Sequence, residues 1–418
     1  MTLMKEAARS VPDIIKKAAK VEGVDPKKLA RLVAAGRAIV PHNPKHASRP
    51  CGIGEGLRVK VNANIGTSPD HCYLKQELVK AKVAIEFGAD AIMDLSIGGN
   101  IDAIRKSIIK KVDVAIGTVP IYQAANEAGH ILDMDEDIMF RTIEKQARDG
   151  VDFMTVHCGV TTASVDSLRK AKRICDIVSR GGSFLAVWIL KNKQENPLYK
   201  NFDYLLELAK EHEFVLSLGD GLRPGSILDA TDKAQLHELK ILGELVKRSR
   251  AAGVQAMVEG PGHVPFDQIE HNVRLEKAIC KGAPFYVLGP LVTDIAPGYD
   301  HIVGAIGGAL AAYHGADFLC YVTPAEHLGL PDLEDVKNGV IASKIAAHAV
   351  DLTRGFDLEK DRAMSKARKA LDWEGMFKNA IDPVTARKKR DKRPAKSRDK
   401  ACSMCGKFCA MDTMNELL

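Results

Sequence analysis

The sequence has no long run of apolar residues. Nothing in its 418 residues approaches the roughly 18 consecutive apolar residues that a membrane-spanning helix needs, so we expect no membrane association. The first twenty residues contain scattered lysine and glutamate without an apolar core, and no secretion signal is predicted. Cysteine is also sparse, because nine residues over this length do not make a disulfide framework. We therefore expect a reducing compartment, the cytoplasm.

Net positive charge is missing from most of the chain. The formal net charge is +6, but the segment 387–400 alone holds nine lysines and arginines against two aspartates. The rest of the chain is therefore close to neutral. A nucleic-acid-binding face needs basic residues clustered on the folded body, so no nucleic-acid partner is predicted. The basic segment is typical of a solvated linker, which we expect to be mobile when the site is empty.

A repeated unit is present from about residue 56 to residue 330. An apolar, β-branched stretch ends in Gly, Asp, Asn, His or Pro, and a helical pattern follows. Near-continuous apolar strands alternating with helices predict a parallel sheet buried on both faces. The nine candidate stretches end at 61–66, 92–96, 116–120, 154–159, 184–188, 216–220, 257–260, 286–289 and 319–323.

Eight such units close an α/β barrel of the (β/α)8 TIM type, so one of the nine candidates must lie outside it. The alternative is an open doubly wound sheet. Polar residues follow every candidate strand instead of gathering at one switch point, which favours the barrel.

The barrel is flanked by helical segments. Residues 1–55 are predicted to be helical, with helices starting near Ser10–Asp13 and Asp25–Lys28. Residues 331–386 form a second predicted helical region, with helices over Pro331–Leu352 and Asp361–Lys378. Residues 387–418 are interpreted as a basic linker followed by a cysteine-bearing tail.

Three cysteines are gathered in the tail. Cys402, Cys405 and Cys409 lie within eight residues, a spacing that suits one corner of a 4Fe–4S cluster. Three thiolate ligands leave one iron open, as a substrate-binding cluster requires. Structural zinc takes four ligands, and no fourth Cys or His lies nearby in the sequence. A solvated thiol tail is the remaining alternative.

Two histidines follow separate predicted strands, each with a glutamate close by. His263 ends the motif that begins at Glu259, and His327 follows Glu326. Zinc, iron or manganese would suit such a pair. The alternative is that both are hydrogen-bonded loop residues.

Three glycine-containing segments have the composition of phosphate-binding loops. They are Ser96–Gly99, Ser179–Ser183 and Asp220–Ser226, and the last two also contain an arginine. Glycine lets the backbone approach a ligand closely, and arginine can donate two hydrogen bonds to phosphate oxygens. A phosphorylated ligand is therefore predicted.

The same segments belong to a recognisable set of motifs. From about residue 50 to the end, the chain resembles the phosphomethylpyrimidine synthase family, thiamine pyrimidine synthases that are non-standard radical S-adenosylmethionine (SAM) enzymes. The matching stretches are Asn62–Ser68, Met93–Ser96, Gly117–Gln123, Val178–Gly182, Ser217–Gly225, Glu259–Pro265, Tyr299–His301, Val322–Leu328 and the cysteine tail.

The resemblance implies a barrel that binds 5-aminoimidazole ribotide and a mobile tail that carries a 4Fe–4S cluster. With one electron from a donor, the cluster would cleave SAM to methionine and a 5′-deoxyadenosyl radical, which starts the rearrangement of the ribotide. It also implies a homodimer in which one subunit's tail reaches the other's barrel.

The resemblance assigns roles to particular residues. Cys402, Cys405 and Cys409 would bind the cluster, and His263 and His327 would bind a second, divalent metal such as zinc. The ribotide contacts would be Asn64, Met93, Tyr122, His157, Ser179, Arg180, Gly181, Asp220, Gly221, Leu222, Arg223, Glu259 and Tyr286.

The sequence departs from the family pattern at several positions. Three residues separate Cys405 from Cys409 where better-known members have four, and Ile97, Asn100 and Lys191 stand where Thr, Asp and His are common. A related family, 5-hydroxybenzimidazole synthase, makes the lower-ligand base of cobamides from the same ribotide. The thiamine activity is the commoner one, so we favour it.

Two other classes of protein remain open from the residues alone. A zinc-dependent barrel hydrolase would use His263 and His327 without a redox tail. A non-catalytic metal-binding interaction protein would not need polar residues at the strand ends.

Overall fold

The computed structural model describes residues 1–394 and 401–417, in two compact units. The first unit is Met1–Val350 and the second begins at Asp351, so that the boundary falls near the end of helix α15 (Leu333–Thr353). Within the described ranges, no helix combines the length and apolar character needed to cross a membrane.

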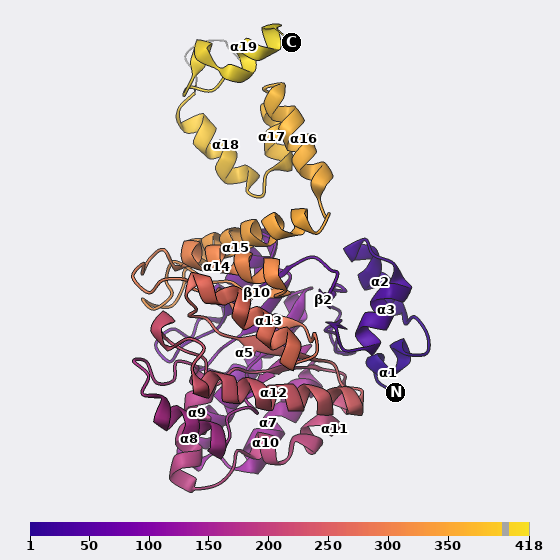
Figure 1. Cartoon of the computed structure of the whole chain (residues 1–418), viewed down its shortest axis with the longest axis vertical. Helices are drawn as coiled ribbons and strands as arrows, with labels where there is room; N and C mark the ends of the chain where they lie inside the picture. The colour runs from indigo at the N-terminus through magenta and orange to yellow at the C-terminus, as the bar shows by residue number, and fades with distance from the viewer. Residues whose placement is uncertain (395–400, 418) are drawn as a thin grey trace. The chain divides into compact units, whose positions relative to one another are not determined.

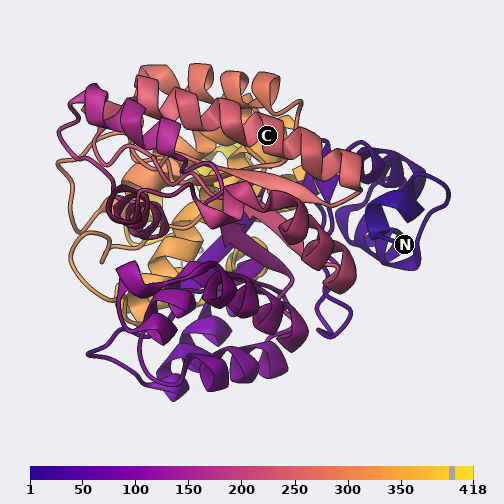
Figure 2. The ribbon, with the colours of Figure 1, turned by 90° about the horizontal axis from the view of Figure 1, so that it is seen from below.

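Eight parallel strands form a closed barrel at the centre of the first unit (Figure 2). Each strand pairs with its sequence neighbour, and β10 pairs with β3 to close the ring. This confirms the predicted α/β barrel. The strands are β3 (Lys60–Ile65), β4 (Ala91–Asp94), β5 (Ala115–Thr118), β6 (Phe153–Val156), β7 (Val215–Leu218), β8 (Ala256–Gly260), β9 (Phe285–Leu288) and β10 (Phe318–Cys320).

Aromatic rings fill the inside of the barrel. The rings of Tyr286 and Phe318 stack with centroids 4.5 Å apart, and the ring of Phe153 meets Phe318 edge-on at 6.2 Å. Gly117 provides the space for Phe153, because a Cβ atom at residue 117 would lie 2.2 Å from that ring. The barrel floor is therefore a packed core, and any ligand has to bind at the strand ends above it.

The fifth of the nine candidate strands lies outside the barrel and is not a strand. Its residues, 184–188, lie in helix α9 (Arg180–Asn192), where Leu185, Ala186, Trp188 and Ile189 are buried. A short apolar run that is buried on a helix face has the same sequence pattern as a buried strand. The error matters for function, because it hid the fact that Ser179 is the N-cap of a helix.

The barrel is surrounded by helices that connect its strands (Figure 1). They are α4 (Leu74–Glu86), α5 (Ile101–Lys111), α6 (Pro120–Ala128), η1 (Ile131–Asp133), α7 (Glu136–Asp149), α8 (Thr162–Ala171), α9, α10 (Pro197–Lys200), α11 (Phe202–His212), η2 (Ile227–Asp229), α12 (Lys233–Ala252), η3 (Phe266–Gln268), α13 (Ile269–Ile279) and α14 (Asp300–His314).

The N-terminal segment packs beside the barrel with a small core of its own. It contains α1 (Leu3–Ala7), α2 (Asp13–Glu22), α3 (Pro26–Ala34) and the antiparallel pair β1 (Ala38–Ile39) and β2 (Ile53–Gly54). Asp25 caps α3 by accepting a hydrogen bond from the Lys28 N–H, as its position before Pro26 indicates. A buried ion pair of 2.9 Å between Glu22 and Lys60 joins this segment to the first barrel strand.

The second unit is helical. It contains α16 (Leu358–Lys369), α17 (Trp373–Asn379), α18 (Pro383–Lys392), η4 (Gly406–Phe408) and α19 (Ala410–Leu417). The single helix predicted over Asp361–Lys378 is thus two helices, because Leu371 adopts a positive φ of 52° between them. Residues 387–392, interpreted from composition as linker, belong to α18, and residues 395–400 lie outside the described residues.

Candidate active site

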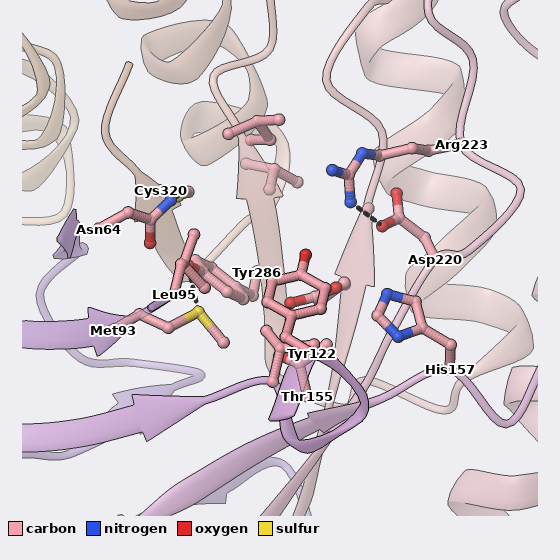
Figure 3. A pocket seen from close by; sticks show the side chains of 15 residues that line it. Asn64, Met93, Leu95, Tyr122, Thr155, His157, Asp220, Arg223, Tyr286 and Cys320 are labelled. Carbon is pink, nitrogen blue, oxygen red and sulfur yellow. Dashed lines mark hydrogen bonds and ion pairs between the residues drawn. The ribbon is translucent and has the colours of Figure 1, made fainter. Parts of the chain in front are cut away.

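A pocket of about 450 Å³ opens at the carboxyl ends of the barrel strands (Figure 3). Side chains from all eight strands or from the turns directly after them line it, since parallel strands deliver the residues that follow them to one end of a barrel. Its lining is Asn64, Met93, Leu95, Val119, Tyr122, Thr155, His157, Asp220, Arg223, Glu259, Gly260, Tyr286, Val287, Leu288 and Cys320.

One side of the pocket is built on a chain of amides and hydroxyls. The Asn62 amide donates hydrogen bonds to Asn64 Oδ1 at 2.8 Å and to the Tyr286 hydroxyl at 2.7 Å. Asn64 Nδ2 lies 3.1 Å from the sulfur of Cys320. These bonds orient Asn64, and Figure 3 shows it beside Met93 and Cys320, across the pocket from Arg223.

The opposite side is built around a neutral histidine. Burial, followed by the positive charge of Arg223, lowers the pKa of His157 to about 3. His157 Nε2 lies 3.2 Å from the Ser179 hydroxyl, and its Nδ1 has no hydrogen-bond partner among the described residues. A Cβ atom at Gly181 would lie 2.3 Å from the imidazole, so only glycine allows the start of α9 to approach this ring.

Acidic and basic side chains share the same wall. Arg223 pairs with Asp220 at 3.3 Å, drawn as a dashed line in Figure 3. Burial raises the pKa of Asp220 and of Glu259, although the nearby Arg223 opposes this for both. Thr155 donates a 2.8 Å hydrogen bond to Glu259. His157, Asp220 and Glu259 therefore all have perturbed pKa values in one concave site, which is typical of a functional centre.

Two of the three predicted phosphate-binding segments are in contact. A Cβ atom at Gly182 would lie 2.0 Å from the Gly221 carbonyl oxygen, so the first turn of α9 packs directly on the Asp220 loop. Ser179 caps α9 by accepting a 3.2 Å hydrogen bond from the Gly182 N–H. The Arg180 guanidinium lies over the Tyr122 ring, 5.0 Å from its centroid. A helix N-terminus with two arginines nearby suits an anion.

The third segment faces a second pocket, of about 830 Å³, that shares Asn64 and Leu95 with the first. Ile97 of this segment and Arg180 both line it. The Thr67 hydroxyl donates a 2.7 Å hydrogen bond to the Gly98 carbonyl, which holds the glycine pair against the end of β3. Two pockets therefore adjoin at the barrel mouth.

A buried glutamate outside every sequence motif supports the Asp220 loop. Glu238, buried on α12, accepts a 2.7 Å hydrogen bond from the Leu222 N–H. Burial raises its pKa to about 8, against the lowering effect of hydrogen bonds from the Leu222 and Gly221 backbone. A single glutamate in a helix carries no pattern. The pocket residues Thr155 and Cys320 were also missed from the sequence, and they lie inside the apolar runs of β6 and β10.

The two predicted metal-binding histidines lie side by side, with ring centroids 5.3 Å apart. His263 Nδ1 is 2.8 Å from Asp294, and His327 Nδ1 is 3.4 Å from Asp300. A carboxylate on Nδ1 leaves Nε2 free to bind a metal, the usual arrangement of metal-binding histidines. Burial lowers the pKa of His263, although Asp294 opposes it, and this favours the neutral imidazole that can act as a ligand.

The three tail cysteines have the chemistry of cluster ligands. None is in a disulfide; Cys402 is half-buried, Cys405 exposed and Cys409 buried. Hydrogen bonds from the Met404 and Cys405 backbone lower the pKa of the Cys402 thiol, which favours the thiolate that binds iron. The donor set fits a cluster with one open iron, but within the described ranges no three Cys, His, Asp or Glu side chains are gathered as metal ligands.

Comparison with known proteins identifies the family. The model of the radical SAM ThiC family matches residues 2–416. The chain belongs to the radical SAM ThiC family. It is therefore an enzyme of the radical SAM type, and membership implies SAM and a 4Fe–4S cluster as cofactors. This decides against the zinc-hydrolase and interaction-protein classes.

Named members of the ThiC family are similar over their full length. The phosphomethylpyrimidine synthase of Methanopyrus kandleri is 57% identical, covering 100% of this chain and 99% of that protein. The phosphomethylpyrimidine synthase of Thermoanaerobacter sp. is 59% identical, covering 96% of this chain and 94% of that protein. A dihydropteroate synthase structure from Stenotrophomonas maltophilia covers 76% of this chain and 99% of that chain at 12% identity, with a TM-score of 0.46, and has no bearing on function.

Proposed function

We propose that this enzyme converts 5-aminoimidazole ribotide to 4-amino-5-hydroxymethyl-2-methylpyrimidine phosphate for thiamine biosynthesis. The observation that carries the proposal is the pocket at the barrel mouth, in which eight of the thirteen expected ribotide contacts converge. The other five belong to the start of α9, Ser179–Gly181, and to the Asp220–Arg223 loop, which pack on each other at its rim. The names of the relatives support the same reaction.

The charged side of the pocket would bind the ribotide phosphate. Arg223, Arg180 and the first turn of α9 offer guanidinium and backbone N–H donors to an anion. Neutral His157 would accept or donate a hydrogen bond through its unpartnered Nδ1 without adding charge. Asn64 and Tyr286 would orient the imidazole end on the opposite side.

The second pocket would bind SAM. It adjoins the first through Asn64 and Leu95, so that the two substrates would meet at that boundary. Glu326 lines it, and its carboxyl suits a sulfonium or ammonium group. When bound to Cys402, Cys405 and Cys409, the cluster would supply the electron that generates the 5′-deoxyadenosyl radical from SAM.

The histidine pair would hold the second metal, which we propose is zinc. The neutral His263 and the carboxylates on both Nδ1 atoms support this assignment. Metal analysis of a His263→Ala, His327→Ala double variant should show the loss of one divalent ion beyond the cluster iron. His271→Ala, an exposed histidine on α13, is the matched control. Unchanged metal content in the double variant would make the pair structural.

We further propose a homodimer in the cytoplasm. The exposed apolar side chains Tyr299, Ile302, Ile306 and Tyr313 on and beside α14 support a protein interface. Nine cysteines without a disulfide support a reducing compartment.

Two of the three departures from the family pattern, Asn100 and Lys191, do not separate the thiamine product from 5-hydroxybenzimidazole. Asn100 caps α5 through the Ala103 N–H, a role in which Asn and Asp are equivalent. Lys191 is exposed on α9. The third departure, Ile97, lines the second pocket.

An anaerobic assay would test the reaction. Reconstituted enzyme with SAM, dithionite and 5-aminoimidazole ribotide should form 5′-deoxyadenosine and the pyrimidine phosphate, detected by mass spectrometry. Arg223→Met should lose ribotide binding, whereas Arg169→Met, at an exposed position of α8, should not. Formation of 5-hydroxybenzimidazole would identify the alternative product, and the absence of 5′-deoxyadenosine would overturn the proposal.

A further inference from the structure

Helix α18 in the second unit is rich in positive charge. Its ten residues, Pro383–Lys392, include Arg387, Lys388, Lys389, Arg390 and Lys392, and Arg393 follows as the C-cap. From composition alone, this stretch is predicted to be a solvated linker. In the structure it is a helix, and the side chains of a helix point to different faces.

One face of α18 packs on α17. Arg387 donates two hydrogen bonds to the Glu374 carboxylate, at 2.8 and 2.5 Å, and its guanidinium lies 4.4 Å from the Phe377 ring centroid. Arg390 lies over the Trp373 ring at 3.4 Å. These two arginines therefore have structural partners and fix the orientation of the helix.

The opposite face of α18 is basic near the end of the helix. At about 100° per residue, Lys388, Lys389 and Lys392 fall on the side opposite Arg387 and Arg390. Arg393, the C-cap, follows directly after Lys392. All four are exposed, and none forms an ion pair with the acidic residues of the described ranges. The acidic residue of the helix, Asp391, projects on the side of Arg387. We call these four residues the basic face of α18.

The basic face ends beside the cysteine loop. The Ser403 hydroxyl donates a 2.7 Å hydrogen bond to the Arg393 carbonyl, which joins the end of α18 to the residue after Cys402. A partner bound on the basic face would therefore lie next to the cluster ligands.

We propose that the basic face of α18 is the docking surface for an acidic one-electron carrier protein that reduces the cluster. This inference rests on the proposed function, because radical cleavage of SAM consumes one electron that this chain does not supply. One electron leaves the reduced carrier, which is oxidised by one electron, and the cluster is reduced by one electron. No covalent bond forms or breaks in this step.

Charge complementarity gives the reason to choose an acidic carrier. Four unpaired cations in two turns of helix attract a carboxylate-rich surface and increase its association rate by roughly 10- to 1,000-fold at low salt. A small reductant such as dithionite needs no docking surface. The two reductants therefore separate docking from the chemistry that follows.

The test uses a variant in which Lys388, Lys389, Lys392 and Arg393 are all changed to Gln. The control variant changes Lys17, Lys20, Lys27 and Lys28, four exposed lysines of α2 and α3, to Gln. The probe is a reduced acidic flavodoxin. Its rate of cluster reduction is measured by stopped-flow absorbance, and carbodiimide cross-linking followed by peptide mass spectrometry locates its contacts on the full-length protein.

We expect flavodoxin-driven reduction of the α18 variant to fall about tenfold or more at low salt. Dithionite-driven reduction should be unchanged, and cross-links in the wild-type protein should map to Lys388, Lys389 or Lys392. The control variant should behave as wild type. High salt should bring the wild-type rate down towards that of the α18 variant.

The proposal is overturned if flavodoxin reduces the α18 variant and the control variant at the same rate. It is also overturned if the α18 variant loses its dithionite rate as much as its flavodoxin rate. A third contrary outcome is an α18 variant that no longer binds DNA or anionic vesicles but keeps the wild-type flavodoxin rate. If wild-type enzyme takes up electrons but forms no 5′-deoxyadenosine, the proposed reaction fails and the docking surface stands. The two failures are therefore distinguishable.

Discussion

Glu238 shows how a side chain beneath a pocket can define the pocket's shape. Its carboxyl accepts the Leu222 N–H at 2.7 Å and sits under the loop that presents Asp220 and Arg223. Without it, backbone N–H groups of that loop would be buried and unpaired, at a cost of about 1–3 kcal/mol each. The loop would then rearrange to recover hydrogen bonds, and Arg223 would move with it.

We therefore predict that Glu238→Ala raises the KM for the ribotide about tenfold or more, while Glu238→Gln, which keeps an acceptor oxygen, restores most of the affinity. Steady-state kinetics on both variants would check this. If Gln and Ala have the same KM, the carboxyl fills space and does not position the loop.

Glu276 on α13 is a second buried glutamate, and it makes stability depend on pH. Burial raises its pKa to about 8, and Asp317 adds to the shift while Lys277 and Arg250 oppose it. Between about pH 4.5 and 8 the folded protein holds a proton here that the unfolded chain has released. Stability contributed by this group is therefore complete at low pH and is lost as the pH rises through the folded pKa.

Glu276→Gln should abolish this dependence, because the amide stays neutral. We expect the difference in Tm between pH 5.5 and pH 8 to be smaller in the variant, corresponding to on the order of 1 kcal/mol per pH unit. Glu244→Gln, an exposed glutamate of α12, should leave the difference as in wild type. A parallel shift of both Tm values in Glu276→Gln would contradict the raised pKa.

At the scale of elements, the contact between α9 and the loop after β7 assembles the anion-binding side of the site. A Cβ atom at residue 182 would lie 2.0 Å from the Gly221 carbonyl, and both partners are backbone, so neither can rotate away. Overpacking of this kind costs about 1–3 kcal/mol. The start of α9 and the Asp220 loop would have to separate.

Gly182→Ala should therefore weaken ribotide binding by about tenfold or more while the barrel stays folded. Isothermal titration calorimetry and circular dichroism would measure the two effects. The neighbouring Ser183→Ala substitution places its methyl group on an existing Cβ and should bind normally. Equal affinities in both variants would mean that this contact does not shape the site.

The same region shows what the sequence can and cannot predict. Eight strands followed from apolar runs ending in polar residues, because every barrel strand is buried on both faces. Residues 184–188 show the same apolar run although they lie on a buried helix face. The length of a short apolar run does not separate a buried strand from a buried helix. The sequence motifs predict ligand contacts such as His157 and Arg223. Glu238 and Cys320 acquire their roles only through contacts with residues distant in the sequence.

At the scale of the whole molecule, the candidate binding pocket and the cysteine loop belong to different compact units. The pocket residues all precede residue 350, and the three cysteines all follow residue 400. The main hydrophobic core of the first unit is built, among the described residues, from side chains between Ile39 and Val350. Loss of the cluster should therefore leave the barrel intact, because its hydrophobic packing does not depend on the tail.

We predict that a Cys402→Ala, Cys405→Ala, Cys409→Ala variant forms no 5′-deoxyadenosine but binds the ribotide with wild-type affinity. The matched control changes Cys72, Cys158 and Cys175 of the barrel unit to Ala, and it should retain the cluster absorbance near 400 nm. Calorimetric binding and anaerobic absorbance spectra would measure the two properties separately. A triple tail variant that still cleaves SAM would exclude these cysteines as cluster ligands, and one that loses ribotide binding would show that the tail completes the pocket.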